Sequence, residues 1–480
     1  MCAPIIVPYL THIINRSFLE YKFPNQWKRS KVIPIHKSGN KNSPNNFRPI
    51  SILPTVSKLL ERFVQRQLVS FLEENKLLSA EQFGFRSKHS TITSLVKITD
   101  RWMNAVDQGK YTGAVFIDLK KAFDCVDPDL LLEKLRNIGI AEECLPWFND
   151  YLHNRFISTY FGSTLSSHLP ISFGVPQGSI LGPLLFIIFV NDLTQYTHYC
   201  SIQLYADDTV LYFSDFNVES VQNKLNHDLS YIYKWMCNNK LTLNFDKTVS
   251  LLIGSRHMLS KCNKLNVYIN NIAIQQTDSV KYLGFIIDSK LKWDVHIDKL
   301  CKRVGNLVKY LARLRYFINE TNLNLIYKAI ILPLFDYADI LIDSCDKKYI
   351  KKLQTLQNRA GRIIMKVNPY EHISNAQIHS LLKWSSLESR RKKNLNVFVY
   401  KSVHNMLSPS MNEMFQPPSH IYSLRNSGNF VLPKPRTEYC RRTTQYRSSI
   451  QYNTLPPTTK LLQTVQTFKK YLNNTIPDFL

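Results

Sequence analysis

The sequence SIQLYADDTVLYF (residues 201–213) places two adjacent aspartates between two short β-prone runs, Ser201–Tyr205 and Thr209–Phe213. Two such runs joined by a short turn predict a hairpin with Asp207 and Asp208 at its tip. Adjacent carboxylates repel each other, and Mg²⁺, which prefers one or two carboxylates together with substrate phosphates, would relieve that repulsion. The alternative is a solvated Asp-Asp turn without a ligand.

A second acidic position strengthens the metal hypothesis. The apolar run Ala114–Ile117 predicts a buried strand, and Asp118 follows it where the pattern changes to helical spacing from Lys120 onward. Ligands commonly bind beyond the carboxyl ends of strands. If this strand pairs with the 201–213 hairpin, three carboxylates converge, as two-metal phosphoryl and nucleotidyl transfer requires.

The two acidic positions belong to a longer ordered series of motifs. The loop Gly174–Ser179 precedes an apolar run that predicts a buried helix, Ile180–Val190. The full series is FRPIS (Phe47–Ser51), FIDLKKAFD (Phe116–Asp124), GVPQGSILGPLLF (Gly174–Phe186), YADD (Tyr205–Asp208), LTLNFDKT (Leu241–Thr248) and KYLGFIID (Lys281–Asp288). In this order the motifs resemble the reverse-transcriptase domain of non-LTR (LINE-type) retrotransposons, most closely jockey/CR1-like elements, from about Phe23 to the C-terminus.

The resemblance implies an α+β right-hand polymerase fold, with fingers, a palm built on a ferredoxin-like antiparallel sheet, a helical thumb and a C-terminal basic extension. The expected division is an N-terminal segment with the fingers at 1–110, a palm at 111–290 with a fingers insert at 138–170, a thumb at 291–400 and a loop-rich basic tail at 401–480. The tail is expected either to bind RNA or to be a loosely ordered basic extension.

The resemblance also implies the metal site. Asp118 and Asp207 would hold two ions, and Asp208 would be a nearby, less direct ligand. Mg²⁺ and Mn²⁺ both accept oxygen ligands, so the sequence leaves the choice open. One ion would lower the pKa of a primer 3′-hydroxyl and the other would neutralise the incoming triphosphate.

By the same resemblance, five residues would bind the nucleotide. Phe123 would form the floor of the sugar pocket and exclude a ribose 2′-hydroxyl; alternatively it is a core aromatic. Lys37 and Arg48 would bind the triphosphate, for which an arginine offers two parallel donors; alternatively they are solvated surface charges. Gln177 and Gly178 would lie beside the template base and nucleotide, the glycine permitting close backbone approach.

Further positions are implied around the reacting end. Lys247, after the strand-like run Leu241–Phe245, would protonate the pyrophosphate as a general acid; a solvated turn lysine is the alternative. Tyr282, Leu283 and Gly284 resemble the primer-grip hairpin.

Charge supports a nucleic-acid partner. Lysine and arginine number 61 against 36 acidic residues, a formal net charge of +25. After Asp288 the sequence becomes helical and basic. The resemblance places this segment in the thumb, so Lys302 and Arg303 are expected to contact duplex phosphates; alternatively they belong to the solvated charged face of an ordinary bundle helix. The nine cysteines form no CxxC pair, so neither zinc binding nor a disulfide framework is indicated, and no apolar run is long enough to span a membrane.

The sequence therefore predicts an intracellular RNA-directed DNA polymerase, in the nucleus and/or cytoplasm, that extends a DNA primer on an RNA template with deoxynucleoside triphosphates. Oligomeric state is left open. No endonuclease is found, so a truncated copy is expected. The alternatives are a catalytically decayed retroelement product or a structural RNA-binding protein that only binds nucleic acid, and a maturase or telomerase-like polymerase, for which the additional RNA-binding domains are not found.

Overall fold

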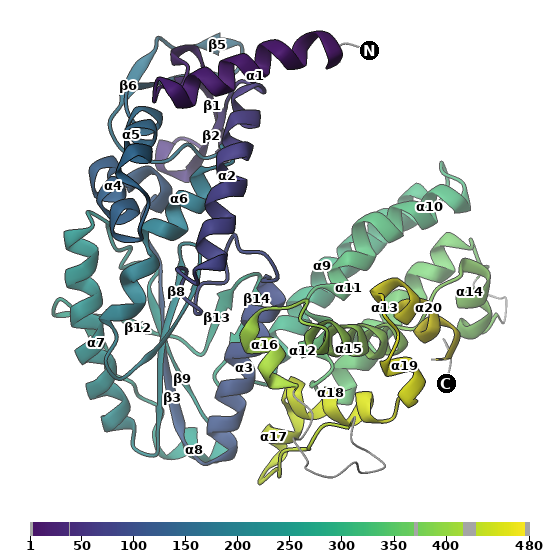
Figure 1. Ribbon diagram of the computed structural model, residues 1–480. Coiled ribbons are helices and arrows are strands. Elements are labelled where there is room, and N and C mark those ends of the chain that lie inside the picture. The colour runs from purple at the N-terminus through teal and green to yellow at the C-terminus, as the bar shows by residue number, and fades with distance from the viewer. Residues whose placement is uncertain (1–2, 38, 369–372, 416–428, 476–480) are drawn as a thin grey trace.

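The computed structural model describes residues 3–37, 39–368, 373–415 and 429–475. The chain has a U-shaped outline in Figure 1, with a sheet lobe (residues 3–288) on the left and a helical lobe (residues 294–475) on the right. The fold is mixed α and β. Within the described residues, no helix is long and apolar enough to cross a membrane.

The central sheet of the sheet lobe has the strand order β12-β9-β3-β8-β7. Its strands and flanking helices are β3 (Tyr111–Ile117), β7 (Ser201–Tyr205), β8 (Asp208–Asp215), β9 (Val249–Ile253), β12 (Gln275–Gln276), α3 (Thr91–Asp107), α7 (Val218–Asn238) and α8 (Arg256–Lys261). β3 pairs antiparallel with β8, Ile117 facing Thr209. The predicted pairing of the Asp118 strand with the hairpin is therefore confirmed.

Successive apolar side chains of β3 point to opposite faces of the sheet, which explains why helices cover both faces. Ala114 and Phe116 belong to one hydrophobic cluster with α3, whereas Val115 and Ile117 belong to another with α7. Successive side chains of a strand point to opposite faces, so a continuously apolar strand is buried on both. Figure 1 shows α7 and α3 on opposite sides of β3. This packing fixes the end of β3, from which Asp118 projects.

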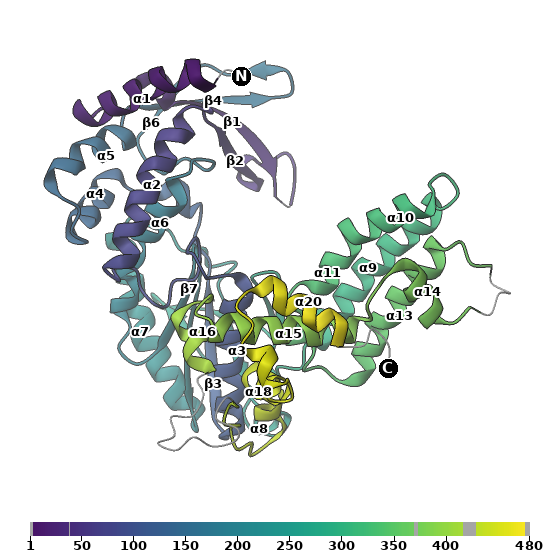
Figure 2. The ribbon, with the colours of Figure 1, turned by 45° about the vertical axis from the view of Figure 1, so that its right-hand side comes forward.

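A second sheet stands beyond the first, with strand order β2-β1-β4-β5 and β6 paired to β4. Its elements are α1 (Ala3–Leu19), β1 (Arg29–His36), β2 (Phe47–Ile52), α2 (Ser57–Glu74), α4 (Pro128–Asn137), α5 (Leu145–Leu152), β4 (Arg155–Phe161), β5 (Thr164–Leu165), β6 (Leu169–Ile171) and α6 (Gly182–Phe189). The 138–170 insert therefore joins the same sheet as the N-terminal segment, because β4 pairs parallel with β1. Figure 2 shows the β1–β2 hairpin projecting from this part.

The hairpin of β13 (Ser279–Tyr282) and β14 (Phe285–Asp288) leads into the helical lobe, and the small strands β10 (Tyr268–Ile269) and β11 (Ile272–Ala273) precede it. The helices that follow are α9 (Asp294–Leu314), α10 (Glu320–Ile326), α11 (Leu332–Asp336), α12 (Asp339–Ile342), α13 (Lys347–Ile364), α14 (Asn375–Leu382) and α15 (Leu387–Val403). A π-helical turn, Tyr327–Ile331, joins α10 to α11. Val304, Val308 and Leu311 of α9 are buried and lie on one face of the helix.

Two sequence expectations are wrong. Leu241–Phe245 is not a strand: only Leu243 forms an isolated bridge, to Leu119. The C-terminal segment is not predominantly loop, since it contains α16 (Pro409–Met414), α17 (Glu438–Arg442), α18 (Thr444–Asn453), α19 (Pro457–Lys460) and α20 (Val465–Thr475). Residues 416–428 and 476–480 of that segment lie outside the described residues.

Contacts with α3 hold the described part of the C-terminal segment against the sheet lobe. The carboxylate of Asp100 accepts hydrogen bonds from the backbone N–H of Thr444 and Gln445, both at 2.8 Å. Asp107 accepts from the N–H of Thr437 at 2.6 Å. These carboxylates satisfy the unpaired N–H groups at the starts of α18 and α17.

Candidate active site

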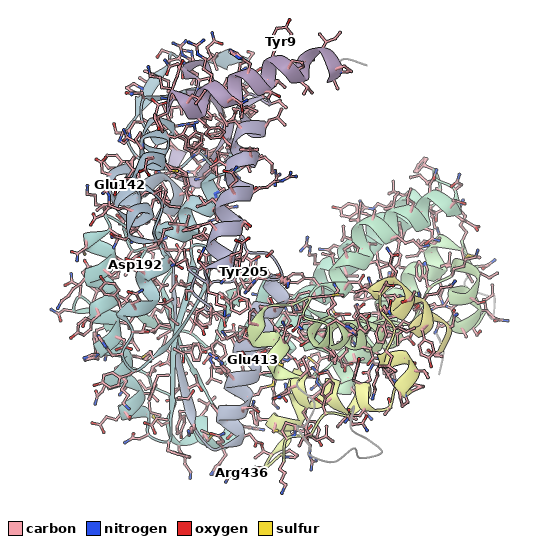
Figure 3. All side chains as sticks on the ribbon, viewed as in Figure 1. Tyr9, Glu142, Asp192, Tyr205, Glu413 and Arg436 are labelled. Atoms are coloured by element: carbon pink, nitrogen blue, oxygen red, sulfur yellow. The ribbon has the colours of Figure 1, made fainter. Side chains whose placement is uncertain are left out.

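The turn between β7 and β8 holds the aspartate pair. Tyr205 and Asp208 are directly paired, which leaves Ala206 and Asp207 as a two-residue loop. Ala206 has a φ of +56°, a conformation uncommon for a residue with a side chain. Figure 3 shows Tyr205 on the inner side of the bend between the two lobes. The turn therefore places the Asp207 and Asp208 carboxylates at the same end of the sheet as Tyr205, on the inner side of the bend.

Asp118 lies beside this turn and is held by residues of the LTLNFDKT motif. Asn244 Nδ2 donates to Asp118 Oδ2 at 2.8 Å, and the N–H of Asn244 donates to the carbonyl of Asp118 at 2.9 Å. Thr248 Oγ1 accepts from the N–H of Asp118 at 3.2 Å. These three bonds fix both the backbone and the carboxylate of Asp118.

Burial and neighbouring carboxylates raise the pKa values of the two turn aspartates. Both turn carboxylates reach solvent, yet the surrounding protein removes much of their hydration. This burial, with repulsion from Asp207 and Asp118, raises the pKa of Asp208 to about 6. Burial and Asp118 likewise raise the pKa of Asp207. The positive charges of Lys37 and Arg48 oppose both shifts in pKa, so these two predicted residues lie within electrostatic range of the turn aspartates.

The donor chemistry of this cluster fits a divalent cation. Carboxylate oxygens are the ligands that Mg²⁺ and Mn²⁺ prefer, and an uncompensated group of acids favours binding of positive charge. Among the described residues, however, no three His, Cys, Asp or Glu side chains form a ready-made metal cage. The three aspartates therefore lie close enough for their charges to repel one another, but they do not form the closed geometry of a ligand shell.

A cavity adjoins the 174–179 loop. Its volume is about 220 Å³, and it is lined by Ile50, Phe123, Pro176, Gln177, Gly178 and Pro183. The Phe123 ring stacks on Phe186, with centroids 4.4 Å apart. Gln177 Nε2 donates to Asp124 Oδ1 at 2.9 Å. Three of the predicted nucleotide-pocket residues, Phe123, Gln177 and Gly178, are therefore brought together in one cavity.

Close backbone contact joins the cavity to β2. The N–H of Ser51 donates to the carbonyl of Gln177 at 2.7 Å. Gly178 has a φ of +133°, and a Cβ at this position would lie 2.3 Å from the Ser51 carbonyl oxygen. Only glycine fits both the conformation and the space. Buried Glu61 of α2 accepts from the N–H of Ile180 at 2.6 Å and fixes the other end of the loop.

Other predicted residues lie outside these two groups. The Lys247 side chain is exposed. Tyr282 is buried, and burial raises the pKa of its hydroxyl, with a smaller contribution from Asp208. The hairpin tip at Leu283 and Gly284 has positive φ at both residues, and Tyr337 donates a hydrogen bond to the Leu283 carbonyl. Lys302 and Arg303 are exposed on α9.

Sequence reasoning missed Asn244, Glu61 and Gln82, all of which contact the predicted motifs. Asn244 lies inside a motif that was singled out only for Lys247. Glu61 lies between two apolar positions of α2, and a glutamate inside an apolar helix face was the available signal. Gln82 precedes Phe83 and Gly84, and no local pattern marks it.

Comparison with known proteins supports the same reading. Residues 35–287 match the family described as reverse transcriptase (RNA-dependent DNA polymerase). The probable RNA-directed DNA polymerase from transposon X-element of Drosophila melanogaster is 28% identical over 90% of this chain and 48% of its own length. The RNA-directed DNA polymerase from mobile element jockey of the same species is 28% identical over 74% of this chain and 40% of its own length.

The chain thus spans about half the length, or less, of these curated relatives. Among solved structures, telomerase from Candida albicans in complex with a fragment of telomeric RNA is 12% identical, with a TM-score of 0.38 over 80% of this chain and 68% of that chain.

Proposed function

The chain belongs to the reverse transcriptase (RNA-dependent DNA polymerase) family, and from that premise we propose that it extends a DNA 3′ end on an RNA template by two-metal nucleotidyl transfer. One observation carries this proposal: Asp118 and the Asp207–Asp208 turn lie at one end of the β3–β8 pair. Phe123, five residues after Asp118, lines a cavity together with Gln177. The proposed polymerase belongs to a jockey-like non-LTR retrotransposon.

In this proposal Asp118, Asp207 and Asp208 hold two divalent cations, Mg²⁺ or Mn²⁺, which when bound supply electrostatic stabilisation of the charge that develops on the α-phosphate. Asn244 keeps the Asp118 carboxylate oriented toward the turn. Lys37 and Arg48, whose charges already act on the turn aspartates, neutralise the triphosphate.

The cavity provides the nucleotide pocket. Phe123, held by its stack on Phe186, packs against the sugar and leaves no room for a 2′-hydroxyl. Gln177 and Gly178 contact the nucleotide and template base. Exposed Lys247 donates a proton to the leaving pyrophosphate. The hairpin tip at Leu283 and Gly284 contacts the primer end.

The proposal also assigns the subdomains of the chain. The N-terminal segment 1–110 and the insert 138–170 form the fingers, which the β1–β4 pairing supports. Residues 111–290 form the palm and 291–400 the thumb, whose exposed Lys302 and Arg303 contact phosphates of the hybrid duplex. The segment 401–480 is the basic C-terminal extension, and its helices α17 and α18 pack on α3.

Primer extension on a poly(rA)/oligo(dT) hybrid tests the proposal. The wild-type chain is expected to incorporate dTTP only with Mg²⁺ or Mn²⁺, and Asp207→Ala is expected to abolish incorporation while binding the hybrid normally. Asp215→Ala is the matched control, because Asp215 lies at the opposite end of β8. Hybrid binding without incorporation by the folded wild type, with either metal, would reduce the assignment to a nucleic-acid-binding retroelement product.

A further inference from the structure

We propose that Gln82 is a positioning residue that holds the aspartate turn in its strained conformation, with Gly84 providing the space for this contact. The structural role of Gln82 is independent of the proposed function, and only its expected effect on catalysis rests on that function. Gln82 is fully buried, and its Oε1 accepts hydrogen bonds from the N–H of Ala206 at 3.0 Å and from the N–H of Gly84 at 2.8 Å. One side-chain oxygen therefore joins the two segments.

The segment that carries Gln82 is an extension of the central sheet. The N–H of Phe83 donates to the carbonyl of Leu204 at 2.8 Å, and the N–H of Leu204 donates to the carbonyl of Glu81 at 2.9 Å. Gln82 and Leu204 form a parallel bridge. β7 is otherwise the edge strand of the sheet, so residues 81–83 pair with its free edge up to the turn.

Helix α3 anchors this extension. Lys97, whose side chain is only 4% exposed, forms an ion pair with Glu81 at 2.7 Å. Its Nζ also lies 5.1 Å from the centre of the Phe83 ring. Phe83 itself is 1% exposed. The turn is therefore tied through residues 81–84 to a long buried helix rather than to a free loop.

The contact leaves no room for adjustment at Gly84. A Cβ at this position would lie 2.4 Å from the backbone nitrogen of Ala206, a distance that real Cβ atoms do not adopt. Ala206, with its φ of +56°, has a conformation that alanine adopts rarely on its own. Such conformations persist where the surroundings over-determine them. Gln82 and Gly84 supply that restraint one residue before Asp207.

The role requires an acceptor at Gln82 but no donor. Gln82 Nε2 has no hydrogen-bond partner among the described residues. Gln82→Met has a similar length and removes the acceptor, so the N–H of Ala206 loses its partner. Gly84→Ala disturbs the same turn by steric contact and leaves the acceptor in place. Two unrelated chemical changes are thus expected to give one phenotype.

Amide hydrogen exchange of the full chain without nucleic acid is the direct test. In the wild type the Ala206 amide is expected to be protected. In Gln82→Met a peptide spanning residues 204–208 is expected to exchange at least about tenfold faster, because a hydrogen-bonded amide exchanges only when it opens. In primer extension, Gln82→Met and Gly84→Ala are expected to lower kcat by about 10- to 100-fold with little change in the KM for dTTP, since small misplacements of reacting groups have effects of this size.

Gln357→Met is the matched control. Gln357 is a buried glutamine of α13 whose Nε2 donates to the Ser385 carbonyl at 3.1 Å. It is expected to lower Tm about as much as Gln82→Met, with no change in kcat or in exchange at 204–208. Should Gln82→Met fail to fold, Gln82→Asn, whose amide oxygen falls one methylene short, is compared instead.

Wild-type exchange rates at 204–208 in the Gln82 variant would overturn the inference, and so would an equal loss of kcat in Gln357→Met. The exchange comparison does not depend on polymerase activity. A wild-type chain that incorporates no nucleotide would therefore contradict the proposed function, while the exchange rates still decide whether Gln82 holds the turn.

Discussion

Asn244 donates to Asp118 through both its side chain and its backbone, at 2.8 and 2.9 Å. The side-chain bond occupies one oxygen of the carboxylate and fixes the direction of the other. Groups that orient a metal ligand in this way typically contribute 10- to 100-fold to metal affinity or activity.

Asn244→Ala is therefore expected to raise the Mg²⁺ concentration that gives half-maximal primer extension by about tenfold or more. A magnesium titration at saturating dTTP measures it. The control is Asn239→Ala, because Asn239 is also buried but donates only to the Trp235 carbonyl at the end of α7. An unchanged Mg²⁺ dependence in Asn244→Ala would show that Asp118 needs no such partner.

Phe123→Ala is expected to relax selection against ribonucleotides, because the ring that lines the 220 Å³ cavity is lost. The ratio of kcat/KM for dGTP over GTP on poly(rC)/oligo(dG) is expected to fall by about 10- to 100-fold, the usual range for one small group in an apolar pocket. Both substrates carry the same base, so only the sugar is compared.

Phe216→Ala is the control for Phe123. Phe216 is an exposed phenylalanine that follows β8 at the end of the sheet opposite the aspartates. If Phe123→Ala keeps the wild-type ratio while remaining active, Phe123 is a core aromatic and something else excludes the ribose hydroxyl.

The sequence predicted those parts of the site that depend on local pattern. The β-prone runs around Asp207 and the apolar run before Asp118 specify strands, and burial on both faces forces them into one sheet. Phe123, Gln177 and Gly178 were implied by the family resemblance, because the motifs that contain them match it. The central sheet and its acidic end therefore followed from periodicity, turn chemistry and family resemblance.

The supporting contacts could not be predicted, because their partners are distant in the chain. Gln82 contacts Ala206 across 124 positions, and Glu61 contacts Ile180 across 119. Glu61 stands out as a glutamate inside an apolar helix face, but nothing near it in the sequence indicates its partner, and Gln82 has no local signature at all. The C-terminal helices were missed for the same reason, since Asp100 and Thr444 are 344 positions apart.

Arg48→Ala is expected to raise the KM for dTTP by about tenfold or more, because a charge-assisted contact to the triphosphate is lost. Arg48→Lys is expected to recover only part of this, since lysine cannot form two parallel hydrogen bonds. Arg29→Ala removes an exposed arginine from the start of β1 and is the control. Equal KM values for Arg48→Ala and Arg29→Ala would show that Arg48 is a solvated surface charge that does not bind the triphosphate.

The final prediction concerns pH and the anchoring of the C-terminal helices. Burial raises the pKa of Asp100 from 3.8 to about 6, although Thr444 and Gln445 donate to it. Between pH 4 and 6 the unfolded chain releases this proton while the folded chain retains it. The contribution of Asp100 to the free energy of unfolding therefore falls by about 3 kcal/mol as pH rises through this range, and is constant above it.

Asp100→Asn removes that titration and keeps one acceptor oxygen. Relative to the variant, the wild type is expected to lose about 3 kcal/mol of stability between pH 4 and 7, measured by urea unfolding at each pH. Asp107→Asn on the same helix is the contrast. Burial alone would raise the pKa of Asp107, but hydrogen bonds from Thr437 hold it below its ordinary value. Asp107→Asn is expected to lower the free energy of unfolding by an amount that does not change with pH above pH 4. The same pH profile in both variants would contradict a buried, proton-retaining Asp100.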